Sequence, residues 1–123
     1  MNVTKETIQA TQQSVDHWER MIEWAREQYP KSPADYLYMI AEIGEDWYSG
    51  SCPLCKYFLR PDTSCSECPL KTVFGHCDDP QALNAWSDIR RSRTWGEWLE
   101  AAEVMLFQLE TVLKLLKGGG ENA

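Results

Sequence analysis

Five cysteines are the residues of this 123-residue chain best suited to chemistry, and all of them lie within residues 50–77. Cys52 and Cys55 form one pair with two residues between them, and Cys65 and Cys68 form a second such pair nine residues later. A two-residue gap lets two thiolates converge on one tetrahedral ion, so the two pairs predict a four-thiolate metal site. Soft thiolates in this geometry favour Zn²⁺, with an iron–sulfur cluster as the alternative.

The odd number of cysteines leaves the exact ligand set open. Cys77 is the first alternate for one of the four positions, and His76 beside it is the second. Disulfides are disfavoured, because an odd count leaves one thiol over and a cytosol keeps thiols reduced. Catalytic zinc keeps an open position, so a closed set of thiolates indicates a structural ion. We expect the metal to order residues 50–77, which carry too little apolar surface to fold alone.

Paired acids offer an enzymatic alternative. Glu19 and Glu23 are one helical turn apart, and Glu42, Glu45 and Asp46 follow within AEIGEDW. Acids on adjacent helices can bind Mg²⁺ together with substrate phosphates. The arrangement is similar in outline to the all-α MazG-type nucleotide pyrophosphohydrolases, although the spacing of the first pair departs from that family's ExxE. Solvated acidic faces and no enzyme are therefore the favoured interpretation, with a Mg²⁺-dependent phosphohydrolase as the alternative.

The net charge of the chain helps to decide between a protein partner and nucleic acid. The formal net charge is −7. Nucleic-acid affinity rests on Lys and Arg neutralising phosphates, so this charge disfavours nucleic acid and favours a protein partner. A nucleic-acid-binding zinc module stays open as an alternative, because basic residues follow the cysteines. The candidate binding residues are Lys56, Arg60, Lys71, Arg90, Arg91 and Arg93.

Helices are predicted to position these groups over residues 4–29, 32–48, 79–93 and 94–117, where either a fourth helix starts at Thr94 or the third bends there. The first carries a stripe at spacings of three and four: Ile8, Thr11, Val15, Trp18, Ile22, Ala25 and Tyr29. The last carries a matching stripe: Trp95, Leu99, Ala102, Leu106, Leu109, Leu113 and Leu116. We expect these two stripes to pack together, within one chain or across a homodimer.

The predicted helix ends rest on capping residues, proline and glycine. The glycines of KGGGENA should end the last helix, leaving residues 118–123 as a flexible tail. The helix over 32–48 carries apolar residues on two faces and should be covered on both sides. His17 should be partly exposed. The expected start and stop signals are Thr4, Pro30, Ser32-Pro33, Asp79-Pro80 and the capping box Thr94–Glu97.

Together these patterns predict one domain over residues 1–123. Its fold class is all-α, an antiparallel helical bundle with a zinc-stapled irregular insertion at 50–77. The first thirteen residues contain no apolar run and no stretch is long enough for a membrane span, so we expect a cytoplasmic protein without a membrane partner.

The cysteine segment resembles a family of small cysteine-rich proteins from phages and prophages, which share CxLCxY, CxxCPL and a later single Cys. The matching residues within roughly 47–110 are Cys52, Leu54, Cys55, Tyr57, Cys65, Cys68, Pro69, Leu70, Cys77 and Trp86. The resemblance implies a phage setting and a metal site that keeps Cys77 among the candidate ligands, and it implies no activity. We therefore expect a zinc protein that modulates or inhibits a protein of a bacterial host.

Overall fold

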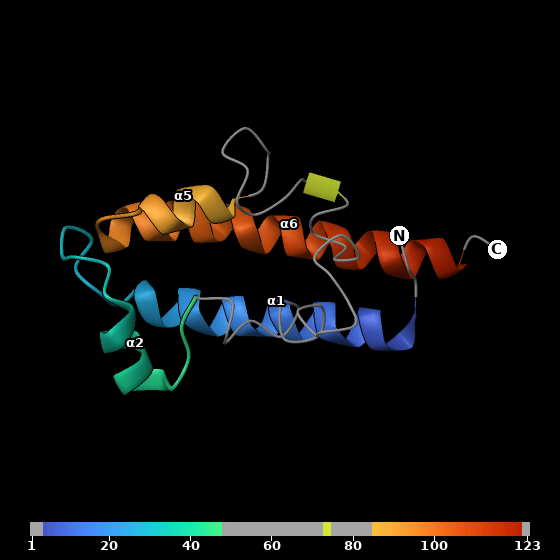
Figure 1. Ribbon diagram of the computed structural model, residues 1–123, viewed down its shortest axis with the longest axis horizontal. Coiled ribbons are helices and arrows are strands. Elements are labelled where there is room, and N and C mark those ends of the chain that lie inside the picture. The colour runs from blue at the N-terminus through green and yellow to red at the C-terminus, as the bar shows by residue number, and fades with distance from the viewer. Residues whose placement is uncertain (1–3, 48–72, 75–84, 122–123) are drawn as a thin grey trace, which may run out of the picture.

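A computed structural model describes residues 4–47, 73–74 and 85–121 of the chain (Figure 1). Its helices are α1 (Lys5–Ala25), α2 (Tyr36–Ile43), α5 (Trp86–Arg91) and α6 (Trp95–Glu121). Within these residues there is no strand, only an isolated antiparallel bridge between Pro33 and Thr94. The predicted all-α class is confirmed for this part of the chain, whereas the full bundle and the zinc-stapled insertion stay predictions.

The two long helices α1 and α6 lie side by side and run in opposite directions, so the start of α1 lies at the same end of the pair as the C-terminal part of α6 (Figure 1). The predicted stripes face each other within one chain. Their buried members are Thr11, Val15, Trp18, Ile22 and Ala25 on α1, and Trp95, Ala102, Leu109, Leu113 and Leu116 on α6. Tyr29 is an exception, because the helix ends before it and its side chain is 65% exposed.

An aromatic cluster fills the end of the helix pair that lies beside α2. Trp98 is completely buried and stacks on Trp18, with ring centroids 6.0 Å apart and planes 16° from parallel. Trp47 and Trp95 pack around Trp98 at 5.3 and 5.8 Å. Trp24 extends the cluster toward the surface, 5.2 Å from Trp95. Large aromatic rings dominate core energetics, so this end is the main anchor of the fold.

The N-terminal end of α1 follows the sequence prediction. Thr4 caps the helix, because its hydroxyl oxygen accepts from the backbone N–H of Thr7 at 3.1 Å. The other end differs, since the helix stops at Ala25 and a turn over residues 26–28 follows. Pro30 disfavours helical geometry at Tyr29, but α1 has already ended at Ala25 before that residue.

Carbonyl groups of the connection between α1 and α2 accept hydrogen bonds from the first turn of α6. The N–H groups of Trp95 and Gly96 have no partner within their own helix, and they donate to the carbonyls of Ser32 (3.0 Å) and Pro30 (2.9 Å). A Cβ on Gly96 would lie 3.2 Å from the Pro30 oxygen, so this close approach favours glycine. The loop and the first turn of α6 are therefore built as one unit.

The capping box predicted at the start of α6 is present with one change. The hydroxyl of Thr94 accepts from the N–H of Glu97 at 3.2 Å, as predicted. The carboxylate of Glu97 accepts from the N–H of Arg93 at 3.0 Å, one residue before the cap. The far end of α6 reaches Glu121, past the predicted end at 117. Glycine lowers helix propensity by only about 1 kcal/mol per residue, so it need not end a helix.

The second predicted helix is wrong at both ends and in its burial. Asp35, rather than Ser32, caps α2 by accepting from the N–H of Leu37 at 2.9 Å. Gly44 ends the helix with φ of 71°, a left-handed conformation that favours glycine. Only Met39 is buried in α2, so the expected cover on both sides is absent from the described part of the chain. The cause is position, since α2 lies at one end of the α1–α6 pair (Figure 1).

The third predicted helix is represented by α5, which packs on α6 through buried Ile89. Its predicted start at Asp79-Pro80 lies outside the described residues. The side-chain oxygen of Gln108 accepts from the N–H of Ala85 at 3.0 Å and fixes the start of α5 against α6. None of the described helices is long and apolar enough to cross a membrane.

Candidate functional site

The predicted metal ligands Cys52, Cys55, Cys65 and Cys68, with the alternates Cys77 and His76, all lie outside the described residues. Among the residues that are described, no three His, Cys, Asp or Glu side chains come together as a metal site. The four-thiolate site therefore stays a prediction from spacing.

The candidate basic residues divide in the same way. Lys56, Arg60 and Lys71 lie outside the described part of the chain. Arg90, Arg91 and Arg93 are exposed on and just after α5. The guanidinium of Arg91 donates to Asp88 at 3.1 Å and to the carbonyl of Ser87 at 3.2 Å, so it serves the helix end.

The acids considered for Mg²⁺ do not form the expected pairs. Glu19 and Glu23 are exposed on α1, and Glu42 is exposed on α2. Asp46 is buried, and it has a partner. Glu45 faces basic side chains, not a second acid. Glu45 thus lies in a polar cluster with basic side chains.

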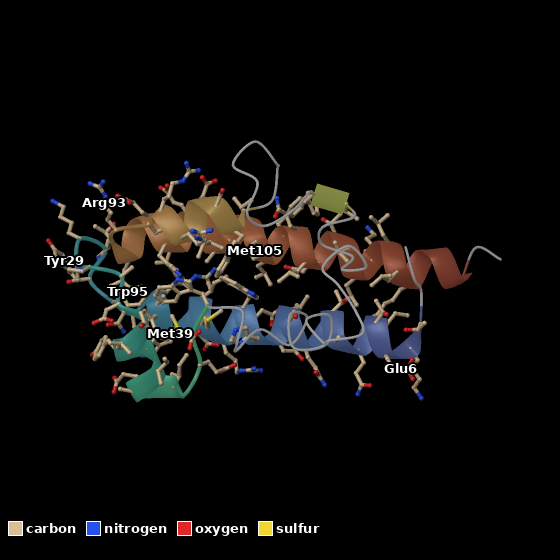
Figure 2. The ribbon with its side chains drawn as sticks, in the orientation of Figure 1. Glu6, Tyr29, Met39, Arg93, Trp95 and Met105 are labelled. Atoms are coloured by element: carbon tan, nitrogen blue, oxygen red, sulfur yellow. The ribbon has the colours of Figure 1, made fainter. Side chains whose placement is uncertain are left out.

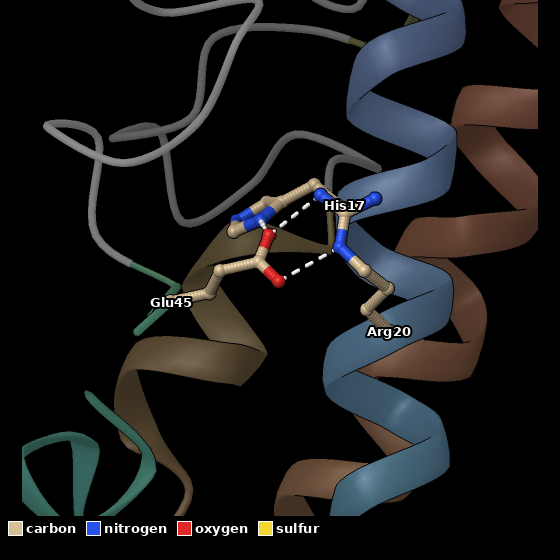
Figure 3. Close-up of polar contacts among 3 residues, drawn as sticks. All are labelled: His17, Arg20 and Glu45. Carbon is tan, nitrogen blue, oxygen red and sulfur yellow. Dashed lines mark hydrogen bonds and ion pairs between the residues drawn. The ribbon is translucent and has the colours of Figure 1, made fainter. Parts of the chain in front are cut away.

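This cluster joins His17 and Arg20 of α1 to Glu45, which follows the end of α2 (Figure 3). The guanidinium of Arg20 donates twice, to Oε2 at 2.7 Å and to Oε1 at 2.6 Å. His17 Nδ1 lies 2.7 Å from the same Oε1. A bidentate guanidinium–carboxylate pair is geometrically specific, so the cluster fixes the end of α2 against α1.

The cluster favours an ionised carboxylate. Hydrogen bonds from Arg20 are the main reason that the pKa of Glu45 lies below its usual range. The bond from His17 lowers the pKa further, while partial burial opposes both effects. With Glu45 ionised and accepting, Nδ1 of His17 carries the proton.

His17 corrects the sequence prediction, because it is 1% exposed instead of partly exposed. Its Nε2 atom is buried, and it has no hydrogen-bond partner among the residues that the structure describes. Neither this burial nor the role of Arg20 had a sequence signal. The contacts of His17 and Arg20 with Glu45 require the chain to return to α1 after Pro30, and helical periodicity does not encode that path.

A hollow of about 460 Å³ lies beside the cluster, between α1 and the end of α2. Its apolar lining is Trp24 and Ile43, and its acids are Glu23, Glu27 and Glu45. Because Arg20 engages both oxygens of Glu45, Glu23 and Glu27 supply the uncompensated negative charge of the hollow. An aromatic face next to carboxylates is suited to a cationic side chain.

A group of exposed apolar side chains lies on α2 and in the connection before it, and we name this group the tyrosine face. It consists of the exposed side chains Tyr29, Tyr36, Leu37, Tyr38 and Ile40. Leu37 is 60% exposed, although it lies in a helix of mostly apolar residues. The Tyr38 ring packs edge-on against Trp24 at 5.4 Å, which joins the face to the aromatic cluster. Tyr29 lies at the α2 end of the molecule, opposite Glu6 (Figure 2).

No protein-family model, curated protein or solved structure matches this chain. The candidate site therefore rests on the geometry of its own residues.

Proposed function

We propose that this protein acts by binding another protein, and that the tyrosine face is the docking surface for a basic amphipathic segment of that partner. The observation that carries the proposal is the exposure of Leu37, Tyr38 and Ile40 on α2. Only Met39 of this helix is buried, and Ile43 packs partly against the core. Clustered exposed apolar and aromatic side chains are typical of interaction surfaces.

Charge defines the chemistry of the partner. Glu23 and Glu27 in the hollow, with exposed Asp35 and Glu42 on and beside α2, give the rim of the tyrosine face a negative potential. The chain as a whole carries −7. Complementary charge steers association and selects partners, so a basic segment is favoured over an acidic one and over nucleic acid.

The hollow gives the basic segment a specific anchor. A Lys or Arg side chain entering it would lie over Trp24 and between Glu23 and Glu27. Apolar residues on the neighbouring turn of the partner would then lie against Leu37 and Tyr38. This is the recognition of an amphipathic helix by an apolar surface with a charged rim.

We test the docking surface with a labelled synthetic helix carrying leucines on one face and arginines on the other. Fluorescence anisotropy should show binding that weakens with salt and falls at least about ten-fold in the Leu37→Glu variant. A matched peptide with glutamates in place of arginines should not bind. Equal binding of the two peptides, or full binding by Leu37→Glu, would overturn the proposal.

The contribution of the hollow is tested by comparing variants of its acids with a variant of an acid outside it. Glu23→Gln combined with Glu27→Gln should weaken binding of the arginine peptide and reduce its salt dependence. Glu19→Gln, an exposed acid on the same helix with no place in the hollow, should leave binding unchanged. Equal effects of the two sets would show that overall charge, and not the hollow, attracts the peptide.

In the phage setting that the cysteine motif implies, the partner would be a host protein that this chain modulates or inhibits. A photo-crosslinking amino acid at position 37 should capture it from a bacterial lysate, and one at position 19 should not. The purified partner must then bind the natural chain and lose at least about ten-fold in affinity for Leu37→Glu. A partner that binds both equally would contradict this use of the face.

We further propose that Cys52, Cys55, Cys65 and Cys68 bind one Zn²⁺, which orders the segment following α2. Structural zinc sites supply about 10–16 kcal/mol of apparent binding free energy. Native mass spectrometry with elemental analysis should find one zinc per chain, lost in Cys52→Ser and kept in Cys77→Ser. Loss in both variants would move Cys77 into the ligand set, and iron with sulfide would identify a cluster.

A Mg²⁺-dependent phosphohydrolase is the weaker alternative. The contacts that Glu45 makes with Arg20 and His17 leave it poorly placed to share a metal ion with a second carboxylate. Release of pyrophosphate from a nucleotide, dependent on Mg²⁺ and abolished by Glu23→Gln, would revive this alternative.

A further inference from the structure

The outer face of α6 carries a second apolar stripe that the pairing with α1 does not use. Val104, Phe107 and Leu115 are 49%, 68% and 48% exposed. At 100° per residue these three side chains and Thr111 fall within one narrow sector of the helix. Apolar side chains sharing an exposed helix face, rather than scattered singly, indicate a contact surface.

Charged residues beside this stripe are ordered along the helix. Glu100 and Glu103 lie near its N-terminal end, and Lys114 and Lys117 lie near its C-terminal end. All four are exposed. Glu110, a further exposed acid, lies between them on the flank of Glu103. The two ends of the face are thus acidic and basic, and these ends are complementary when one copy is reversed.

We propose that a second copy of this chain packs antiparallel along the outer face of α6, forming a two-fold symmetric dimer. With the two-fold axis near residue 109, Val104 lies opposite Leu115 of the second copy. Phe107 then lies opposite Thr111 of the second copy, near the centre. A two-fold axis makes each contact twice, so one stripe serves both copies.

The same register matches the charges. Glu103 lies opposite Lys114 of the second copy, because both residues occupy the same flank of the helix and their numbers average to 108.5. Antiparallel helices place equivalent flanks against each other, as in coiled coils. A parallel pair would place like charges together. Charge order therefore selects the antiparallel arrangement and a second copy, whereas a uniformly basic partner would match only half of the face.

Neighbouring structure is consistent with this occupant. A hollow of about 360 Å³ between α5 and α6 adjoins Val104, and its lining includes Glu97, Glu100 and the ion pair of Asp88 with Arg91. Lys117 of the second copy would approach Glu97 and Glu100 in this hollow. Glu103 also lies 3.5 Å from Arg26, but both side chains are more than half exposed, so that pair is weak.

The dimer goes beyond the proposed docking function and does not depend on it. The α2 ends of the two copies would lie at opposite ends of the particle, about 40 Å apart along the helix axis. Two tyrosine faces at that spacing would let one dimer hold two sites of a repetitive partner. Three large side chains per copy form a small interface, so we expect a weak, concentration-dependent dimer.

Sedimentation velocity over a concentration series tests the proposal on the whole chain. The natural chain should shift from monomer to dimer, and the shift should move to higher concentration in high salt. Phe107→Glu should remain a monomer. Lys114→Glu should weaken association by about ten-fold, and adding Glu103→Lys to it should restore association. Glu19→Lys and Leu37→Glu are the controls, and both should dimerise normally.

A strictly monomeric natural chain, normal dimerisation of Phe107→Glu or failure of the double charge reversal would each overturn the proposal. Circular dichroism on every variant separates lost association from lost folding. The two proposals fail separately, because Leu37→Glu should lose the arginine peptide and keep the dimer, whereas Phe107→Glu should do the reverse.

Discussion

Helices α2 and α6 are both rich in apolar residues, yet the chain uses them in opposite ways. Along α6 the side chains facing α1 are buried, from Trp95 to Leu116. Along α2 only Met39 is buried, and its neighbours Leu37, Tyr38 and Ile40 remain exposed. Hydrophobic stabilisation scales with the area removed from water, so α6 contributes to stability and most of α2 does not.

This difference indicates that the α1–α6 pair stabilises the fold, whereas α2 is available for binding. The α1–α6 pair and its tryptophans form a buried framework, on which α2 packs through Met39 and through ring contacts of Tyr36 with Trp47 and of Tyr38 with Trp24. The polar cluster at Glu45 and the capping bonds of the α1–α2 connection then fix α2 at one end of that framework. A fixed but uncovered apolar helix is suited to binding, because little ordering entropy is lost when a partner docks.

Removing the centre of the framework should have the largest effect. Trp98 is fully buried among Trp18, Trp47 and Trp95. We expect Trp98→Ala to lower the free energy of unfolding by about 3–5 kcal/mol, through lost burial and an unfilled cavity. Urea denaturation followed by circular dichroism measures this loss. Tyr38→Ala, an exposed aromatic, is the control, and equal losses would contradict the assignment of stability to the framework.

The framework was the most predictable part of the molecule. Spacings of three and four residues predicted both stripes, and Thr4 and Thr94 were recognised as caps because capping depends on a few adjacent residues. Periodicity does not say which apolar face will find a partner. The sequence therefore gave no reason to expect α2 to be uncovered, and its two apolar faces led to the opposite prediction.

The candidate site was less predictable for a related reason. The contacts of Glu45 with His17 and Arg20 join residues far apart in the chain, and they depend on the turn at Gly44. Local pattern predicts helices but not the approach of one segment to another. The metal site differs from the cluster at Glu45. The spacing of its cysteines predicts it from the sequence, but those cysteines lie outside the described residues.

Loss of the polar contacts that hold α2 against α1 should have a smaller effect than loss of Trp98. Glu45→Ala removes the acceptor of Arg20 and leaves Nδ1 of buried His17 without its partner. An unsatisfied buried polar group costs about 1–3 kcal/mol, so we expect a loss of that size in urea denaturation. Glu42→Ala, which removes an exposed acid from the same region, is the control. A loss no larger than that of Glu42→Ala would show that the cluster is not a structural tie.

Acid should weaken the same tie. The pKa of Glu45 is lowered in the folded protein by Arg20 and His17, so the folded state favours the ionised carboxylate. This contribution is fully present above the unfolded carboxyl pKa of about 4.3 and is lost as pH falls through the lower folded value. The stability difference between the natural chain and Glu45→Gln should therefore shrink as the medium is acidified. Urea denaturation at a series of acidic pH values measures it, and a difference independent of pH would contradict this origin.

The smallest change in stability is expected for a leucine-to-alanine substitution in α2. The same substitution in α6 provides a direct comparison between the two helices. Leu109 is 1% exposed in α6, and Leu109→Ala should cost about 2–5 kcal/mol through cavity formation. Leu37 is 60% exposed in α2, and Leu37→Ala should change stability by no more than about 0.5 kcal/mol. The cap at Asp35 uses the backbone N–H of Leu37, so truncating the side chain leaves it intact. A large loss at Leu37 would mean that α2 belongs to the framework, whereas a neutral Leu37→Ala with weakened peptide binding would separate binding from folding at a single side chain.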